Sequence, residues 1–340
     1  MNGSAGKTPL ISVVMAVHNA EKYLEKSINS ILNQTFGDFE FVIINDGSFD
    51  RSVEILDHFG RIDGRVRVVH QENKGLAPSL NVGLQMAKGK FIARMDADDI
   101  SFPRRLEIQS GVLLNDTNVG VCHSLVGMID FAGRAIPFKK RAGFRFSSWQ
   151  TRWTLIWRNC IYHPTVMVRR DLLKRYDLNY NLYAIGCEDY ELWCRLAEVT
   201  NFVTIRQPLL LYRRHSKSVT YNFGEEHIVN FASIINNNLN KYIDVAINEH
   251  QSRILALISG QTYLRGSLIS CEIDANFLCY LVDAVTSKFV ELHDIDKFSA
   301  KKIQHAAAQQ FIRWAQQAWS HNKRAVNKFL LTALSHCCPL

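Results

Sequence analysis

Short apolar segments alternate with helical segments over residues 10–95, and this alternation limits the fold more than any other feature of the chain. Residues 10–17 (LISVVMAV) are apolar and rich in β-branched side chains, which is typical of a buried parallel strand. Strands and helices that alternate at this spacing predict an α/β fold, with a mostly parallel sheet flanked by helices on both faces. Further strands are predicted at 39–44, 66–69 and 90–95, and helices at 21–34, 51–60 and 76–87.

Polar side chains follow three of the predicted strands, at the point where each strand ends. The first strand leads into His18-Asn19, the second into Asn45-Asp46-Gly47-Ser48, and the fourth into Asp96-Ala97-Asp98. In open α/β sheets, ligands bind beyond the carboxyl ends of the strands, so we expect these clusters to line one site. No Gly-x-Gly-x-x-Gly motif follows the first strand, which disfavours a dinucleotide.

Asp96 and Asp98 are candidates to bind a divalent cation. Carboxylates two residues apart at a strand end can converge on one ion, and Mg²⁺ and Mn²⁺ favour oxygen ligands shared with substrate phosphates. Such a pair also occurs by chance, so the alternative is a solvated loop in which Asp99 caps a following helix.

Two later segments carry further ionisable side chains. Glu188 and Asp189 open a predicted helix, where a carboxylate is either a cap stabilised by the helix N-terminus or a general base. Arg213, Arg214 and His215 suit phosphate binding or a further cation ligand, although a lone histidine is more often structural.

The character of the chain changes near residue 223, after which long amphipathic segments replace the strands. These segments cover 226–247, 249–265, 273–293 and 299–334, and they predict an α-helical C-terminal region. We therefore expect a flexible N-terminus at 1–8, a catalytic domain at 9–222 and a helical region at 223–340.

Composition narrows the environment and the partners. The net charge of +8 fits nucleic acid, anionic lipid, a phosphorylated substrate or simply a solvated basic surface. We recognise no nucleic-acid-binding module, so no nucleic-acid partner is expected. No run approaches the roughly 18–20 apolar residues of a membrane-spanning helix, and no signal peptide opens the chain. We expect a cytoplasmic protein or one at the inner face of the membrane.

Three tryptophans recur at a spacing of four residues: Trp149, Trp153 and Trp157. This spacing puts them on one helical face. The face would stack on an acceptor sugar, meet a membrane interface with the basic residues at 139–141, or pack into the core.

Taken together, the motifs resemble those of the inverting GT-A glycosyltransferases of family 2, over residues 9–222. The matching segments are 11–19 (ISVVMAVHN), 27–36, 44–48 (INDGS), 73–75 (NKG), 81–83 (NVG), 95–99 (MDADD), 163–167 (HPTVM), 188–189 (ED) and 212–215 (YRRH).

This resemblance implies a role for each matched position. It implies that a nucleotide-sugar donor, with UDP the first candidate, transfers its sugar to a carbohydrate or lipid-linked sugar acceptor in surface polysaccharide or glycolipid synthesis. Asp98 would ligate Mn²⁺ or Mg²⁺, with His215 as the further cation or diphosphate contact. Asp189 would be the catalytic base, with Glu188 near the acceptor. The nucleotide sugar would lie against Ala16, Val17, His18, Asn19, Asp46, Asn73, Lys74, Asp96, Ala97 and Arg213.

The chain departs from the family pattern at three positions. Asn45 replaces the usual first aspartate of Asp-Asp-Gly-Ser, His18 replaces a common tyrosine, and Leu80 replaces a common arginine, for which Lys74 is the candidate substitute. Base, ribose or phosphate contacts therefore differ from those of many relatives, whereas Asp98 and Asp189 are intact.

Other functions stay open at this point. A non-catalytic nucleotide-sugar-binding partner subunit is the main alternative, and a nucleotidyltransferase would also use paired acids. The protein could also bind peripherally to a membrane or form a homo-oligomer.

Overall fold

The computed structural model describes residues 8–137, 147–215, 224–244, 247–259, 275–318 and residue 328. The expected flexible N-terminus lies almost entirely outside these residues, as do the basic residues at 139–141. The chain divides into two compact units. The first comprises 1–145, 161–183 and 195–216, and the second comprises 146–160, 184–194 and 217–340. The expected domain boundary at residue 222 stays a prediction; the second unit also takes in two segments from before it.

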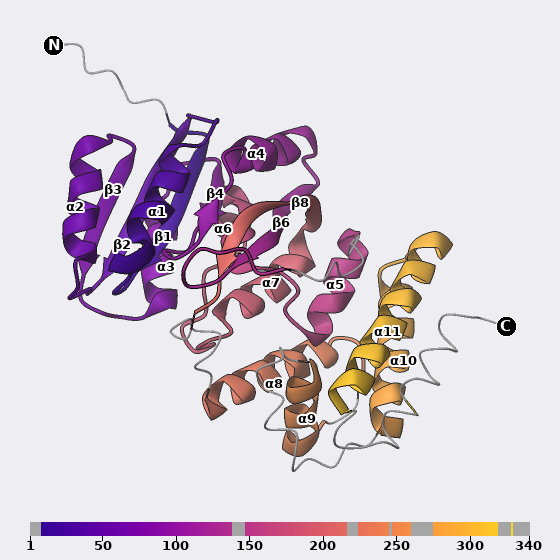
Figure 1. Ribbon diagram of the computed structural model, residues 1–340. Helices are drawn as coiled ribbons and strands as arrows, with labels where there is room; N and C mark the ends of the chain where they lie inside the picture. Colours follow the sequence, from indigo (N-terminus) through magenta and orange to yellow (C-terminus); the bar gives the residue numbers. More distant parts are fainter. Residues whose placement is uncertain are drawn as a thin grey trace. The chain divides into compact units, whose positions relative to one another are not determined.

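Among the described residues, eight strands of the first unit form one mixed sheet (Figure 1). Strands β1 to β4 are parallel to one another, as predicted, while β7 runs antiparallel to both β4 and β6, and β5 antiparallel to β8. Across the sheet the order is β3 (Val66–Gln71), β2 (Phe39–Asp46), β1 (Ile11–Val17), β4 (Phe91–Arg94), β7 (Met167–Arg169), β6 (Val119–Ile129), β8 (Asn201–Arg213) and β5 (Ile100–Ser101).

Helices cover both faces of this sheet, which explains why β1 and β2 are buried along almost their whole length and are largely apolar. Alternate residues of a strand point to opposite faces. Val13 and Phe41 belong to a core that also contains side chains of α1 (Glu21–Leu32), α2 (Ser52–Ile62) and α4 (Arg105–Asn115). Val14 and Ile44 point the other way and lie under Gly83 of α3 (Leu76–Met86). A Cβ at Gly83 would come within 2.5 Å of Val14, so this close packing requires glycine.

The elements predicted in the first hundred residues are therefore confirmed, with ends shifted by one to two residues. The strand at 90–95 is shorter than expected, because β4 ends at Arg94 and the acidic residues continue as a loop. The two short helices of the first unit are η1 (His163–Thr165) and α6 (Arg170–Arg175).

The second unit is helical in its described residues, as predicted for the C-terminal region. Trp153 and Trp157 are fully buried in it, and the Trp157 ring lies 5.8 Å from that of Trp314. The packing interpretation of the tryptophan face is thus confirmed for these two residues, whereas Trp149 is half-buried. The helices are α5 (Ser148–Trp157), the start of α7 (Glu188–Val199), α8 (Glu225–Leu239), α9 (Glu249–Ser259), α10 (Ala275–Leu292) and α11 (Lys297–Ala318).

Across the part of the chain that the structure describes, we find no helix with the length and apolar character needed to cross a bilayer.

Candidate functional site

The loop that follows β1 is fastened to the loop that follows β2. The backbone N–H of Asn19 donates to Ser48 Oγ at 3.0 Å, and the N–H of Phe49 donates to Asn19 Oδ1 at 3.0 Å. Asn19 has a φ of 50°, in the left-handed region where asparagine is better tolerated than most residues. The two loops form one rigid support beyond the carboxyl ends of β1 and β2, where the polar clusters were predicted to meet.

His18 is held on this support by polar neighbours on both of its ring nitrogens. Its Nδ1 lies 2.8 Å from the carbonyl oxygen of Asp46, and its Nε2 lies 2.9 Å from the amide nitrogen of Asn19. The amide nitrogen of Asn73 lies 3.0 Å from Nδ1 and 3.3 Å from Nε2. Three of the residues predicted to contact the nucleotide therefore gather around one imidazole.

The carboxylate of Asp46 is buried beneath them and organises the β3–α3 loop. Oδ1 accepts from Gln71 Nε2 and from the backbone N–H of Lys74, both at 2.8 Å, and Oδ2 accepts from the N–H of Gly75 at 2.9 Å. Burial alone would raise the pKa of Asp46, but these hydrogen bonds outweigh it and hold the pKa below its ordinary value.

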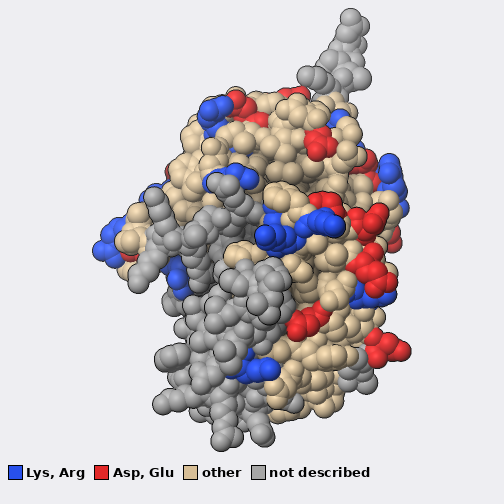
Figure 2. Space-filling model, turned by 90° about the vertical axis from the view of Figure 1, so that its right-hand side faces the viewer, with Lys and Arg blue, Asp and Glu red and all other residues tan. Residues whose placement is uncertain are grey.

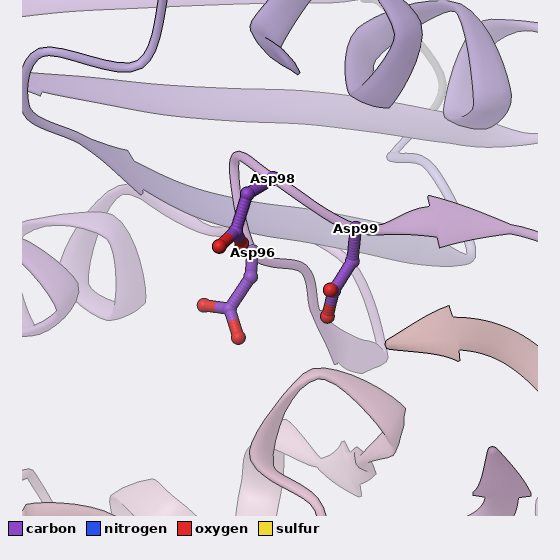
Figure 3. Close-up of side chains that lie close together, drawn as sticks. All are labelled: Asp96, Asp98 and Asp99. Atoms are coloured by element: carbon purple, nitrogen blue, oxygen red, sulfur yellow. The ribbon is translucent and has the colours of Figure 1, made fainter. Parts of the chain in front are cut away.

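Beyond β4, three aspartates gather on one short loop. One carboxylate oxygen each of Asp96, Asp98 and Asp99 lies within 4.8 Å of the others, and Figure 3 shows the three side chains turned to the same side of the loop. The predicted pair is therefore a trio. The alternative interpretation, in which Asp99 caps the following helix, is wrong, because the N-cap of α4 is Arg104.

Two buried arginines offset part of this negative charge. Arg94 Nη2 donates to Asp96 Oδ1 at 2.6 Å, and Arg94 is only 4% exposed. Arg105 is fully buried and donates to the Arg94 carbonyl at 2.6 Å; burial lowers the pKa of its guanidinium to about 10. The sequence analysis did not predict a role for Arg94, although an ionisable residue inside an apolar strand indicates a buried charge that needs a partner.

Asp96 and Asp99 differ in how far neighbouring groups and water offset the charge of the carboxylate. Burial, followed by repulsion from Asp98 and Asp96, raises the pKa of Asp99 well above its ordinary value. Burial also raises the pKa of Asp96, against the opposing charge of Arg94. Because 29% of the Asp96 side chain is exposed, water screens its charge more than that of Asp99, which is 1% exposed.

The end of β8 closes over this loop. The backbone N–H of Arg213 donates to Asp99 Oδ1 at 2.8 Å, and its Nε donates to the carbonyl of Asp98 at 2.7 Å. His215 Nε2 then lies 2.8 Å from Asp98 Oδ2, and its ring lies 5.2 Å from that of Tyr23. Arg213 is 3% exposed, and its hydrogen bonds hold the loop together. A direct contact of Arg213 with the nucleotide sugar stays a prediction.

These residues fit a divalent cation. Carboxylate oxygens and an imidazole nitrogen are ligands that Mn²⁺ accepts, and carboxylates and water suit Mg²⁺. Oδ2 of Asp99 is buried without a hydrogen-bond partner, so the trio keeps an uncompensated acceptor beside Asp98. A cation would relieve the repulsion that raises the pKa of Asp99.

Asp189 and Glu188 open α7, in the second unit. Asp189 Oδ1 accepts from the N–H of Tyr190 at 2.6 Å, and Oδ2 accepts from Asn159 Nδ2 at 2.8 Å. Glu188 is 8% exposed. Asn159 has no sequence signal, because it follows α5 in an irregular segment and lies 30 residues from its partner.

The remaining predicted residues differ in exposure. Val17 is buried in the core, while Ala16 and Ala97 are half-buried. The Lys74 side chain is exposed above Asp46.

Charges of both signs are interspersed over the described residues of the face in Figure 2.

Comparison with known proteins gives a consistent answer. The model of the family "Glycosyl transferase family 2" matches residues 12–177. The chain is 37% identical to the O-antigen biosynthesis glycosyltransferase WbnJ of Escherichia coli over 215 residues, which are 62% of this chain and 81% of WbnJ. It is 36% identical to the glycosyltransferase MJ1057 of Methanocaldococcus jannaschii over 209 residues, covering 60% of this chain and 71% of that protein.

Solved structures share the architecture at low sequence identity. S. aureus TarS 1–349, in complex with UDP-GlcNAc, has a TM-score of 0.59 and 17% identity, over 96% of this chain and 91% of that one. The mannosyltransferase PcManGT of Pyrobaculum calidifontis, in complex with GDP-Man and Mn²⁺, has a TM-score of 0.53 and 15% identity, over 97% and 87%. These likenesses concern the fold alone.

Proposed function

Because the chain belongs to glycosyltransferase family 2 and has the GT-A fold, we propose that it transfers a sugar from a nucleoside-diphosphate sugar to an acceptor hydroxyl, with inversion at the anomeric carbon and with Mn²⁺ or Mg²⁺ as cofactor. UDP is the first candidate for the nucleotide.

The meeting of Asp98 and His215 carries this proposal. The two side chains are 117 residues apart in the chain and 2.8 Å apart in the fold. Asp98 belongs to the acidic trio, which lies beyond the same sheet edge as His18 and Asp46. Cation ligands beside a nucleotide subsite are what the transfer of a diphosphate-activated sugar needs.

Each group has a defined task in this proposal. Asp98 and His215 would hold the cation, which when bound acts as a Lewis acid and offsets charge on the diphosphate. Asp99 fixes the end of β8, and with it the approach of His215 to Asp98. Arg94 donates to Oδ1 of Asp96, and Oδ2 of Asp96 would contact the ribose or the cation.

The nucleoside would lie on the support made by the β1 and β2 loops. The backbone of Ala16 and Val17, the ring of His18 and the amides of Asn19 and Asn73 would contact the base. Asp46 would accept a hydrogen bond from the base, such as the N–H of uracil. Lys74, exposed above this carboxylate, fits a phosphate. Ala97 and Arg213 complete the predicted contacts.

The acceptor hydroxyl would lose its proton to Asp189. General-base assistance contributes typically about 10²–10⁴ in rate. The backbone N–H of Tyr190 and the amide of Asn159 both donate to the Asp189 carboxylate. Glu188 would lie near the acceptor.

We place the reaction in surface polysaccharide or glycolipid synthesis, because WbnJ is named for O-antigen biosynthesis. A carbohydrate or a lipid-linked sugar would be the acceptor, and residues 9–222 the catalytic region. Peripheral contact with the inner face of the membrane would bring the enzyme to a lipid-linked acceptor.

A thermal-shift panel identifies the donor. The purified chain is heated with UDP- and GDP-sugars, with Mn²⁺ or with EDTA. A donor at 100 times its dissociation constant stabilises the folded state by about 2.7 kcal/mol. We expect a shift with one nucleotide class only, and only with the cation. No shift with any nucleotide sugar would contradict the proposed donor class.

Turnover of single variants tests the two acids. Asp189→Asn is expected to abolish transfer while the donor-induced thermal shift is retained. Asp98→Ala is expected to lose the Mn²⁺-dependent part of that shift. Glu191→Gln, in the same first turn of α7 as Asp189, is the matched control and keeps turnover. Near-normal transfer by Asp189→Asn would show that another group is the base.

A further inference from the structure

Two backbone carbonyl groups of the acidic loop accept hydrogen bonds from side chains outside the loop. Ser27 of α1 donates through Oγ to the carbonyl of Asp96 at 2.8 Å. Nε of Arg213, at the end of β8, donates to the carbonyl of Asp98 at 2.7 Å. The loop is therefore fastened at two points, one on each side of Ala97. Because a side chain leaves from its backbone, these two points help to set where the carboxylates of Asp96 and Asp98 lie.

The ring of Tyr23 supports the second of these points. Tyr23 lies four residues before Ser27 and so on the same side of α1. The guanidinium carbon of Arg213 lies over this ring, 4.5 Å from its centroid. Arg213 is 3% exposed, and a cation–π contact is strongest where water is excluded. The ring therefore supports the guanidinium that donates to the carbonyl of Asp98.

The same ring contacts a second residue at the end of β8. The rings of Tyr23 and His215 lie 5.2 Å apart between centroids, with 33° between their planes. Nε2 of His215 lies 2.8 Å from Oδ2 of Asp98. Tyr23 thus contacts both residues that approach Asp98 from β8: Arg213, which reaches its backbone, and His215, which reaches its carboxylate.

Core packing does not account for an aromatic ring at position 23. The apolar side chains that α1 packs against the sheet are Leu24, Ile28 and Ile31, all fully buried. One residue corresponds to about 100° around a helix, so Tyr23 lies to one side of this apolar face. Tyr23 is half-buried, and its ring is turned to the end of β8.

We propose that Tyr23 is a positioning residue of the cation site: its ring holds the end of β8 against the acidic loop, so that Asp98 and His215 are in place before the cation binds. The inference rests on the proposed function, in which these two residues hold the cation. Side chains that orient metal ligands from outside typically contribute about 10- to 100-fold to metal affinity. Loss of the ring therefore weakens cation binding.

The test measures the Mn²⁺ concentration that gives half of the thermal shift caused by a nucleoside diphosphate. The nucleotide is UDP or GDP, whichever stabilises the wild type, and each protein is compared with its own sample in EDTA. Tyr23→Leu removes the ring and keeps apolar bulk, and is expected to raise this Mn²⁺ concentration about 10-fold or more. Tyr23→Phe keeps the ring face and is expected to stay within about threefold of wild type.

Phe59→Leu is the matched control. Phe59 is an aromatic residue of α2 in the same unit, and at 5% exposed it is more deeply buried than Tyr23. Its replacement is expected to lower the unfolding temperature in EDTA and to leave the Mn²⁺ concentration unchanged. An equal rise in Phe59→Leu and Tyr23→Leu would show a general loss of structure and overturn the inference.

Asp98→Ala separates this inference from the proposed function. If neither nucleotide stabilises the wild type with Mn²⁺, or if Asp98→Ala responds to Mn²⁺ as the wild type does, the cation site fails and the inference fails with it. If Asp98→Ala loses the Mn²⁺ response while Tyr23→Leu stays within about threefold of wild type, only the inference is overturned. A rise in Tyr23→Phe as large as in Tyr23→Leu would also overturn it, because the ring face is kept.

Discussion

Replacing Asp46 with asparagine removes a buried charge that organises the loop between β3 and α3. The carboxylate accepts three hydrogen bonds, from Gln71, Lys74 and Gly75, at 2.8–2.9 Å. Asparagine keeps one oxygen and replaces the other with an NH₂ group. If the oxygen stays toward Gln71 and Lys74, the NH₂ group faces the N–H of Gly75, and two donors oppose each other.

The expected loss of stability follows from these contacts. A hydrogen bond to a charged group contributes about 1.5–3 kcal/mol, and the Gly75 bond is lost outright. The two other bonds weaken as the charge disappears, since charge-assisted bonds are roughly twice as strong as neutral ones. We expect Asp46→Asn to lower the free energy of unfolding by about 2–4 kcal/mol at pH 7.

Urea denaturation followed by far-UV circular dichroism measures this loss. Asp171→Asn is the matched control, because the Asp171 side chain is 63% exposed and its Oδ2 lies 4.0 Å from Nη2 of Arg175, a long distance for an ion pair. Exposed substitutions of this kind change stability by less than about 0.5 kcal/mol. An Asp46→Asn value within the range of this control would refute the hydrogen-bond reasoning.

The stability of wild type and of Asp46→Asn is expected to depend differently on pH. The pKa of Asp46 in the folded state lies below the ordinary value of 3.8, because its hydrogen bonds outweigh burial. The contribution of Asp46 is therefore fully present above its unfolded pKa, and is lost as pH falls through the lower folded value. The difference between wild type and Asp46→Asn is expected to be constant from pH 7 to 5 and to shrink below about pH 4. A difference that persists unchanged at pH 2 contradicts this account.

Two further substitutions test the packing. Gly47 has a φ of +66°, and a Cβ there would lie 2.6 Å from the backbone nitrogen of Asn73. We therefore expect Gly47→Ala to lower the free energy of unfolding by at least about 1–2 kcal/mol and to weaken donor binding in the thermal-shift assay. Gly37→Ala is the control and is expected to change neither quantity, because a Cβ at Gly37 would have nothing within 4 Å. Trp157 is fully buried, so Trp157→Ala is expected to lower the unfolding free energy by about 3–5 kcal/mol in urea, whereas Tyr183→Ala, at a side chain 87% exposed, is expected to stay within about 0.5 kcal/mol of wild type.

The parts of the fold that the sequence predicted well are those whose burial pattern is local. β1 and β2 are covered by helices on both faces, and their largely apolar sequences reflect this directly. The amphipathic spacing of α1 has the same origin, since one of its faces packs on the sheet. The positions of β7 and β8 in the sheet have no such signal. β7 has only three residues, and the partners of a strand this short depend on the rest of the chain.

By itself, the sequence determined the α/β class, the polar clusters beyond the strand ends and the adjacency of Asp96 and Asp98, because each depends on side chains close together in the chain. Only the tertiary structure decided that His215 reaches Asp98, that Arg94 compensates Asp96 and that Asn159 holds Asp189. These contacts join residues far apart in the chain, so they form only when helices and strands pack together and bring the ends of long intervening segments close. The local hydrophobic periodicity of the sequence carries no information about that packing.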